Sequence, residues 1–258
     1  MLRATSLGVY VLKKSNLLSR HAAHEYWIKR HQTEAGNWQA VGFQGAPRPV
    51  NDAFYACRFR ALKQTLIDRH IQLKGLRVLD VGCGLGDFSR FYAVSGAEVS
   101  GVDVSPEAVE YCNASGSGTF VQASAADLAT RFCVTFDIIH CFDVLYHLTD
   151  EEEWLKTLKA FAELSHAKTI WFLTEFHVGR RISDARHIVK RSVQEYRAAL
   201  GIYNRVVIQE TPLYWFYNAW PALGSRFPAL ITRVEWLGRW AAPFMNERVV
   251  LWVVDRGI

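Results

Sequence analysis

Residues 78–88 read VLDVGCGLGDF, an apolar run that ends in three glycines spaced two residues apart. Glycine adopts left-handed backbone conformations readily and lets a ligand approach the main chain closely. Gly82, Gly84 and Gly86 therefore predict either a tight turn after a buried strand or a turn that clears space for a ligand. The surrounding sequence decides between these interpretations.

From Arg77 onward, segments with strand character alternate with helical ones. The expected strands are RVLDV (77–81), EVSGV (98–102), TFVQA (119–123), FDIIHCF (136–142), TIWFLTE (169–175), RVVIQE (205–210) and RVVLWVVD (248–255). Helical patterns fit between the first five, in FSRFYAVSG, PEAVEYCNA, AADLATRF and EEEWLKTLKAFAEL. This alternation predicts right-handed βαβ units, and hence an α/β fold with helices on both faces of a mostly parallel sheet.

The turn after the first strand is where an open α/β sheet binds its ligand, outside the carboxyl ends of the strands. Asp103, 17 residues past Gly86, ends the second expected strand, where an acidic side chain can bind both hydroxyls of a ribose. The glycine spacing is G-x-G-x-G, whereas dinucleotide sites use G-x-G-x-x-G. Asp87 follows directly, and its carboxylate disfavours a pyrophosphate. The pattern suits a ligand with a cationic amine and no phosphate.

VLDVGCGLGDF followed by VSGVDVS resembles the first two motifs of class I S-adenosylmethionine-dependent methyltransferases, over about residues 77–177. The resemblance implies a Rossmann-like seven-stranded sheet whose last strand runs antiparallel. It also implies that Asp80 and the glycine turn hold the methionine part of S-adenosylmethionine, and that Asp103 holds the ribose. In FVQASAADL the adenine is expected to meet Ser124, Ala125 or Asp127. The implied donor-binding set is Asp80, Gly82, Cys83, Gly84, Gly86, Asp103, Val104, Ser124, Ala125, Asp127, Cys141 and Phe142.

The segment after the fourth expected strand carries the candidate catalytic residues Asp143, Tyr146 and His147. It resembles the E-x-x-E-H segment of ubiquinone-type O-methyltransferases, with Tyr146 in place of the second carboxylate, so we expect no metal. His147 is a candidate base for a hydroxyl acceptor, because histidine titrates near working pH. The alternative is that His147 caps or packs the following helix. His140 lies inside the strand and is expected to belong to the core.

Charge and cysteine content place broad limits on the partners and the compartment. The 258 residues hold 30 Lys and Arg against 25 Asp and Glu, a net charge of +5, which suits an anionic substrate, a phosphate or a membrane surface without requiring nucleic acid. The five cysteines contain no C-x-x-C pair, which favours a reducing compartment. No segment approaches the roughly 20 apolar residues of a membrane span. We expect a cytoplasmic protein.

Residues 1–72 are expected to form an N-terminal helical cap before a donor-binding domain over 73–258. The cap reads as two helical pieces separated by AVGFQGAPRPVN. In the second piece, Tyr55, Phe59, Leu62 and Leu66 fall on one helical face and are expected to pack on a core. Arg58 either reaches a carboxylate of the donor or acceptor, or lies on the surface.

The segment at about 211–246 is an aromatic-rich insertion containing Trp215, Trp220, Trp236 and Trp240. Within FPALITRVEWLGRW, the residues Leu230, Val234, Leu237 and Ala241 are expected to share one face of a helix. Three interpretations remain open: a lid packed on the sheet, the wall of an apolar acceptor pocket, or a helix in a membrane interface. The upstream run HVGRRISDARHIVKR is either a solvated basic face or the border of the pocket.

The sequence therefore predicts an S-adenosylmethionine-dependent methyltransferase acting at an oxygen of a small-molecule, lipid or glycan acceptor. Neither Asp-Pro-Pro-Tyr nor Pro-Cys follows the fourth expected strand, which argues against methylation of DNA bases, and we expect no nucleic-acid partner. Two alternatives remain: an RNA methyltransferase, or an accessory protein that binds the donor without turnover. The oligomeric state is left open.

Overall fold

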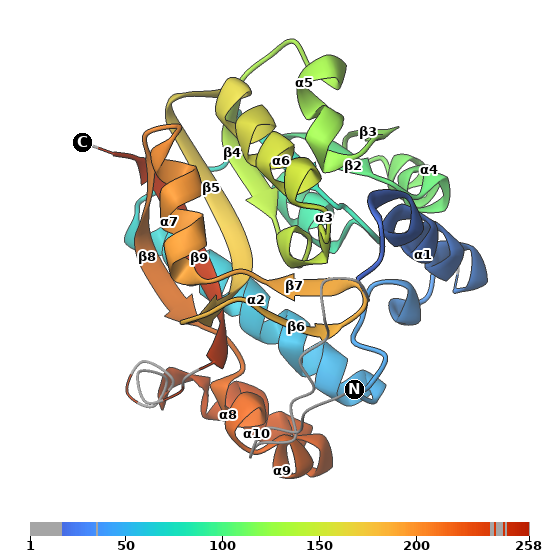
Figure 1. Cartoon of the computed structure of the whole chain (residues 1–258), viewed down its shortest axis with the longest axis vertical. Coiled ribbons are helices and arrows are strands. Elements are labelled where there is room, and N and C mark those ends of the chain that lie inside the picture. Colours follow the sequence, from blue (N-terminus) through green and yellow to red (C-terminus); the bar gives the residue numbers. More distant parts are fainter. Residues whose placement is uncertain (1–16, 35, 238–239, 241–244, 246, 258) are drawn as a thin grey trace.

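The computed structural model describes residues 17–34, 36–237, 240, 245 and 247–257. One seven-stranded sheet has the order β3-β2-β1-β4-β5-β9-β8 (Figure 1). Its strands are β1 Arg77–Val81, β2 Glu98–Asp103, β3 Thr119–Gln122, β4 Phe136–Cys141, β5 Ser165–Val178, β8 Arg205–Pro212 and β9 Glu247–Arg256. All seven expected strands are present.

The direction of the strands confirms the expected mostly parallel sheet. The pairs β1–β2, β2–β3, β1–β4 and β4–β5 are parallel, whereas β9 is antiparallel to both neighbours, β5 and β8. The strand order reverses between β1 and β4, which defines the switch point where α/β sheets bind ligands. The last strand is therefore antiparallel, as expected, and lies inside the sheet.

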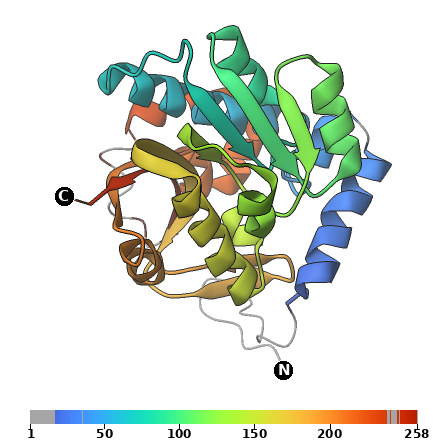
Figure 2. The same cartoon turned by 90° about the horizontal axis from the view of Figure 1, so that it is seen from above.

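Helices cover both faces of the sheet (Figure 2). They are α3 Asp87–Val94, α4 Pro106–Ala114, α5 Leu128–Arg131, α6 Glu151–Glu163 and α7 Val193–Gly201. Neighbouring residues of β1 point to opposite faces: Val78 joins the core that includes Phe88 and Tyr92 of α3, and Leu79 joins the core that includes Trp154 and Leu158 of α6. This two-residue alternation buries the strand on both sides, as in other parallel sheets.

The N-terminal segment forms two helices, α1 Arg20–Thr33 and α2 Arg48–Asp68. Leu62 and Leu66 of α2 are buried in the core shared with α3, and Tyr55 and Phe59 pack against it, as the helical spacing predicts. α1 lies beside α4 at the edge of the sheet (Figure 1). Residues 1–16 of the expected cap lie outside the described residues.

The insertion after β8 contains three short helices, α8 Trp215–Ala219, α9 Pro221–Arg226 and α10 Pro228–Arg233. Proline begins α9 and α10, because its missing N–H and fixed φ suit only a first turn. The expected helix over FPALITRVEWLGRW is wrong beyond Arg233, since residues 235–237 form a separate 3₁₀ turn. The Glu235 side chain accepts the Tyr214 N–H at 2.5 Å, which ties this turn to α8. Ala241 and the Trp236 side chain lie outside the described part.

The basic run upstream of α7 forms a hairpin of β6 Ile182–Ala185 and β7 Ile188–Lys190. Arg180, Arg181 and Arg186 are exposed, which agrees with a solvated basic face. Lys190 and Arg191 do not belong to this solvated face: both are buried, Lys190 beside the Glu247 carboxylate and Arg191 against the Leu148 carbonyl oxygen. In the described part of the chain, no helix combines the length and the hydrophobicity that a membrane span requires.

Candidate functional site

A cavity of about 680 Å³ lies at the carboxyl ends of the central strands, within the usual range of about 300–1,000 Å³ for small-molecule sites. Residues from α1, α2, α8 and β9 complete its wall. The predicted site residues that line it are Asp80, Gly82, Cys83, Gly84, Asp103, Val104, Ser124, Ala125, Phe142, Asp143, Tyr146 and His147. Gly86, Asp127 and Cys141 are not part of the lining.

The glycine turn between β1 and α3 has left-handed backbone at three positions, with φ of 75° at Gly82, 52° at Gly84 and 70° at Gly86. A Cβ at Gly82 would overlap a methyl group of Val144, and one at Gly84 would lie 2.7 Å from a methyl group of Val41. Any larger residue would therefore be strained and would displace the chain packed over the turn. Gly86 forms the N-cap of α3, beside the cavity lining.

Asp103 ends β2 and connects two loops of the site. Its Oδ2 accepts the Gly84 N–H and its Oδ1 accepts the Ser105 N–H, both at 3.0 Å. A carboxylate has about four lone-pair positions, so each oxygen retains capacity for a further donor. Because Asp103 also lines the cavity, its chemistry fits a pair of ribose hydroxyls.

Asp80 is buried at the end of β1, where it accepts a hydrogen bond from the Ser89 hydroxyl at 2.5 Å. Burial raises the pKa of Asp80 to about 7, partly opposed by the Ser89 hydrogen bond. A cationic group in the cavity would favour the ionised form. This carboxyl therefore fits a ligand that brings an ammonium group.

The loop after β3 is held from two sides. Ser124 lines the cavity, but its hydroxyl donates to Glu153 at 2.8 Å, and Glu153 also pairs with Arg20 at 3.2 Å and His24 at 2.6 Å of α1. Asp127 pairs instead with Arg20 at 3.1 Å. Of the three residues predicted to meet the adenine, Ser124 and Ala125 line the cavity. The Ser124 hydroxyl is already bonded to Glu153, so Ala125 can offer its backbone without competition from its side chain.

His147 lies in a 3₁₀ turn over Leu145–His147, stacked parallel to His187 with 5.4 Å between ring centroids. Its Nδ1–H donates to the carbonyl oxygen of His187 at 2.9 Å; because a carbonyl only accepts, Nε2 carries the lone pair. Burial lowers the pKa of His147 to about 3. The ring is therefore neutral near pH 7 and presents a hydrogen-bond acceptor.

Asp143 follows β4 in a left-handed conformation, with φ of 59°, which is uncommon away from glycine. Three groups hold its carboxylate: Arg58 Nη2 at 2.6 Å, the Tyr146 hydroxyl at 3.0 Å and the Thr174 hydroxyl at 2.9 Å. Thr174 Oγ1 also accepts the Asp143 N–H at 2.7 Å. Asp143 therefore orients its neighbours and has little capacity to act as a base.

Arg58 reaches this cluster from α2 and is buried. Its guanidinium lies 5.2 Å from the Tyr55 ring centroid and 5.4 Å from that of Tyr214. Burial alone would lower the pKa of Arg58, but the adjacent Asp143 carboxylate raises it above its ordinary value. The surface interpretation of Arg58 is thus excluded, and Nε finds no hydrogen-bond partner among the described residues.

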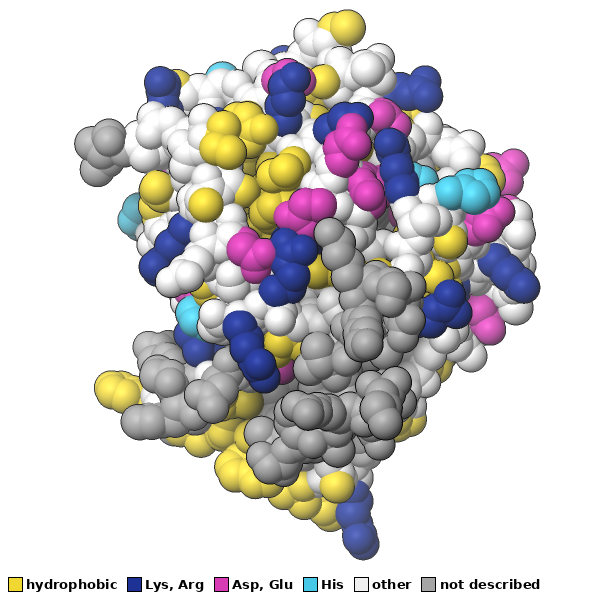
Figure 3. Space-filling model, in the orientation of Figure 1, with side chains coloured by type: hydrophobic (Ala, Val, Ile, Leu, Met, Phe, Trp, Pro, Cys, Tyr) yellow, Lys and Arg dark blue, Asp and Glu magenta, His cyan; other side chains and the backbone are white. Residues whose placement is uncertain are grey.

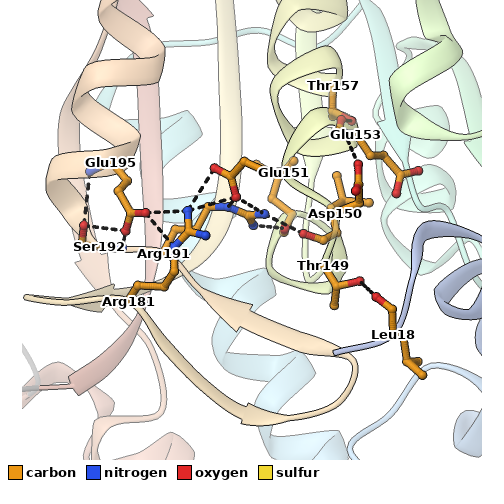
Figure 4. A network of polar contacts seen from close by, with 12 residues as sticks. Leu18, Thr149, Asp150, Glu151, Glu153, Thr157, Arg181, Arg191, Ser192 and Glu195 are labelled. Atoms are coloured by element: carbon orange, nitrogen blue, oxygen red, sulfur yellow. Dashed lines mark hydrogen bonds and ion pairs between the residues drawn. The ribbon is translucent and has the colours of Figure 1, made fainter. Parts of the chain in front are cut away.

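Arg191 anchors the turn that carries the candidate catalytic residues. Its guanidinium donates to the carbonyl oxygens of Leu145 at 3.4 Å and Leu148 at 2.8 Å. Glu151 accepts from Arg191 and, together with Glu195, from Arg181 (Figure 4). Arg191, which belongs to the basic run, therefore holds the backbone of the turn over Leu145–His147 in place.

His140 is buried in β4, as expected, and contacts the Tyr92 hydroxyl through Nδ1 at 3.1 Å. Other lining residues were not singled out from the sequence: Tyr26, Arg30, His31, Phe176, Asn218, Glu247 and Val249. The sequence could have indicated Phe176 and Glu247 as lining residues. Phe176 lies near the end of β5 and Glu247 begins the antiparallel strand β9, and these two ends lie at the same edge of the sheet. The α1 residues had no such signal.

A family model described as a methyltransferase domain matches residues 52–199. The ubiquinone biosynthesis O-methyltransferase of Paraburkholderia phymatum is 36% identical over 102 residues, which are 38% of this chain and 44% of that protein. The enzyme of the same name from Xanthomonas oryzae pv. oryzae is 37% identical over 130 residues, 46% of this chain and 52% of that protein. The chain thus spans about half the length of the curated relatives it matches.

A similar fold occurs in magnesium protoporphyrin IX methyltransferase from Synechocystis PCC 6803 with bound S-adenosylmethionine. The TM-score is 0.60 at 16% identity, covering 95% of this chain and 98% of that one. At this identity the likeness concerns the fold alone, including the mostly parallel sheet with its antiparallel last strand.

Proposed function

The chain belongs to the methyltransferase-domain family, and on that premise we propose that it transfers a methyl group from S-adenosylmethionine to an oxygen of a small-molecule acceptor. The observation that carries the proposal is the position of Asp103, which joins the glycine turn to the next loop while lining the cavity. In this proposal residues 1–72 are the cap and 73–258 the donor-binding domain.

The donor half of the cavity is proposed to bind three parts of the ligand. Asp103 would accept hydrogen bonds from the ribose hydroxyls, and Asp80 would face the ammonium group in its ionised form. The backbone of the glycine turn, which lines the cavity at Gly82 and Gly84, would contact the methionine part, and the absence of side chains there lets Val41 and Val144 pack closely over the turn. The loop at Ser124 and Ala125 would contact the adenine, mainly through its backbone.

The acceptor half is proposed to orient a hydroxyl toward the donor. S-adenosylmethionine supplies a methyl group already activated by a positively charged sulfur, so the protein mainly has to align the reactants. His147 Nε2 would accept a hydrogen bond from the acceptor hydroxyl and so orient a lone pair of the hydroxyl oxygen toward the donor methyl group. With a pKa of about 3, His147 would hold the hydroxyl by a hydrogen bond only; as the oxygen–methyl bond forms and the sulfur–methyl bond breaks, the hydroxyl proton would leave to water and S-adenosylhomocysteine would remain. Asp143 and Tyr146 would fix the surrounding geometry.

The acceptor is proposed to be an amphiphilic molecule with an aromatic or otherwise apolar body. Phe54, Phe176, Tyr214 and Tyr217 line this half of the cavity together with Lys190. The relatives named for ubiquinone biosynthesis support a small lipid-like acceptor. All five cysteines are free, which supports a reducing compartment, and we propose that the protein works in the cytoplasm with peripheral membrane contact.

The proposal is tested by calorimetry and by a transfer assay with labelled donor. S-adenosylmethionine and S-adenosylhomocysteine are expected to bind, and a nicotinamide dinucleotide is not. An acceptor set of phenolic lipids, quinols, glycolipids and RNA then identifies the substrate class. Absence of donor binding would overturn the proposal. Binding with no product on any acceptor would favour the accessory protein, and product on RNA with a steep salt dependence would favour the RNA enzyme.

A further inference from the structure

The helices of the insertion present an apolar outer surface, here called the α8–α10 surface and defined by Trp220, Leu223, Arg226, Phe227 and Arg233. Trp220 is 52% exposed, Phe227 47% and Leu223 42%. These are three of the thirteen large hydrophobic residues found exposed in the described part of the chain, and they fall within eight positions. Figure 3 shows hydrophobic side chains gathered at this end of the molecule. Such clustering marks an interaction surface.

The opposite side of the same helices is fixed to the protein core. Ile231 of α10 is fully buried and packs in the cluster that contains Cys57 of α2. Arg60 donates to the Thr232 carbonyl at 2.6 Å, and the Trp215 indole N–H donates to the Val234 carbonyl at 2.9 Å. The exposed side chains therefore stand on an anchored base.

The charges on the α8–α10 surface all have one sign. From residue 211 to residue 234 the only charged side chains are Arg226 and Arg233, both exposed, and neither forms an ion pair with a described residue. The next charged residue, Glu235, turns its carboxylate toward the Tyr214 N–H. Exposed tryptophan and phenylalanine with arginine and no acid are complementary to an anionic lipid surface.

The segment that forms the α8–α10 surface also contributes to the acceptor half of the cavity. Tyr214, Tyr217 and Asn218 line the cavity, and the exposed segment begins at the next residue, Ala219. An acceptor held in a bilayer would therefore meet the surface and the cavity along one short stretch of chain.

We propose that the α8–α10 surface docks the protein on an anionic lipid bilayer, from which an amphiphilic acceptor enters the cavity. Docking specifies the membrane contact of the proposed function, and the entry step rests in addition on the acceptor proposed there. The helices of five or six residues are too short to insert deeply, so the contact is interfacial. Tryptophan and phenylalanine enter the headgroup region and the arginines meet lipid phosphates.

The docking step is tested with the full chain and vesicles of phosphatidylcholine, with or without one-third phosphatidylglycerol. We expect partition into the anionic vesicles at least tenfold above the neutral ones, decreasing with salt. The combined variant Trp220→Ala, Leu223→Ser, Phe227→Ala is expected to reduce partition at least tenfold. Its matched control is the double variant Ile202→Ser, Ile208→Ser. These residues are also exposed, 71% and 42%, but Ile202 follows α7 and Ile208 lies in β8, outside the α8–α10 surface.

A second pair of variants keeps the test valid if the apolar variant is unstable. Arg226→Glu and Arg233→Glu leave the apolar side chains in place, and each is expected to reduce anionic-vesicle partition at least fivefold. Calorimetry with S-adenosylmethionine on every variant separates the two proposals, because docking variants are expected to retain donor affinity within twofold. Equal partition by wild type and variants overturns docking. Docking is also overturned if light scattering finds a dimer for the wild type and a monomer for the apolar variant, because the surface would then serve self-association.

Discussion

The donor half and the acceptor half of the cavity are built over very different distances along the chain. In the donor half, Asp80 bonds to a residue 9 positions away and Asp103 to one 19 positions away. In the acceptor half, Arg58 contacts Tyr214 across 156 positions. The contacts of Asp80 and Asp103 are local consequences of consecutive strand–loop units, whereas those of Arg58 exist only after α2, β4 and the insertion have packed together.

This difference separates the two tasks of the site. The donor half relies on backbone N–H groups fixed by one carboxylate, so its geometry tolerates little change. The acceptor half relies on side chains contributed by several elements, so its shape follows from whichever residues those elements carry. Loss of Asp103, which fixes this backbone, should therefore weaken donor binding most, whereas acceptor variants should slow turnover and leave donor affinity in place.

The largest effect is expected for Asp103→Ala. The variant loses an anchor for two backbone N–H groups and for the proposed ribose contact, and each hydrogen bond to a charged group contributes about 1.5–3 kcal/mol. We expect the donor Kd from calorimetry to rise about 1,000-fold. The control is Asp137→Ala, which removes a carboxylate that accepts the Arg77 N–H at the other end of β1. A rise below tenfold would remove Asp103 from the donor site.

Arg58→Leu tests the acceptor half. The substitution leaves the Asp143 carboxylate without its ion-pair partner, and an unpaired charge of this kind, 27% exposed, destabilises the cluster by about 2–3 kcal/mol. We expect kcat/KM to fall about 100-fold, with donor Kd changed less than fivefold. The matched control is Arg60→Leu, two residues along α2, whose partner is the surface carbonyl of Thr232. A large change in donor Kd would instead place Arg58 in the donor half.

His147→Asn is expected to lower kcat about tenfold, because it removes an oriented acceptor for the substrate hydroxyl. Since burial holds the pKa of His147 near 3, the wild-type kcat should show no histidine-dependent break between about pH 5 and pH 8. A break near pH 6.5 that disappears in the variant would contradict this, and would restore His147 as an ordinary titrating base.

The smallest effect concerns Asp80, whose pKa burial raises to about 7. A cationic donor favours the ionised form, so donor affinity should fall only about twofold from pH 8 to pH 7, with proton uptake on release. In the free protein the same raised pKa lowers the free energy of unfolding as pH rises from about 4 to about 7, because the unfolded chain ionises first. Asp80→Asn should remove both dependences. Their persistence in the variant would assign them to another group.

The two halves also differ in how far the sequence predicted them. All seven strands followed from apolar runs and turn residues, and the ends of β1 and β2 placed Asp80, the glycines and Asp103 together. For the run that contains Lys190 and Arg191, a solvated face and the border of the pocket both stayed open, because a run of basic residues does not reveal which members pack inward. Arg30 and His31 had no pattern at all, since the contact of α1 with the site depends on the path of the chain through residues 34–47.

The pairing of β8 with β9 has a consequence for engineering. β8 ends at Pro212, directly opposite Val250, so the long segment between them leaves the sheet and re-enters it at neighbouring positions. An ordinary hairpin turn would close the same gap. The insertion therefore begins and ends at neighbouring positions of the sheet, and a replacement that keeps an apolar side packed on α2, as Ile231 does here, offers a direct way to transplant acceptor choice onto an unchanged donor site.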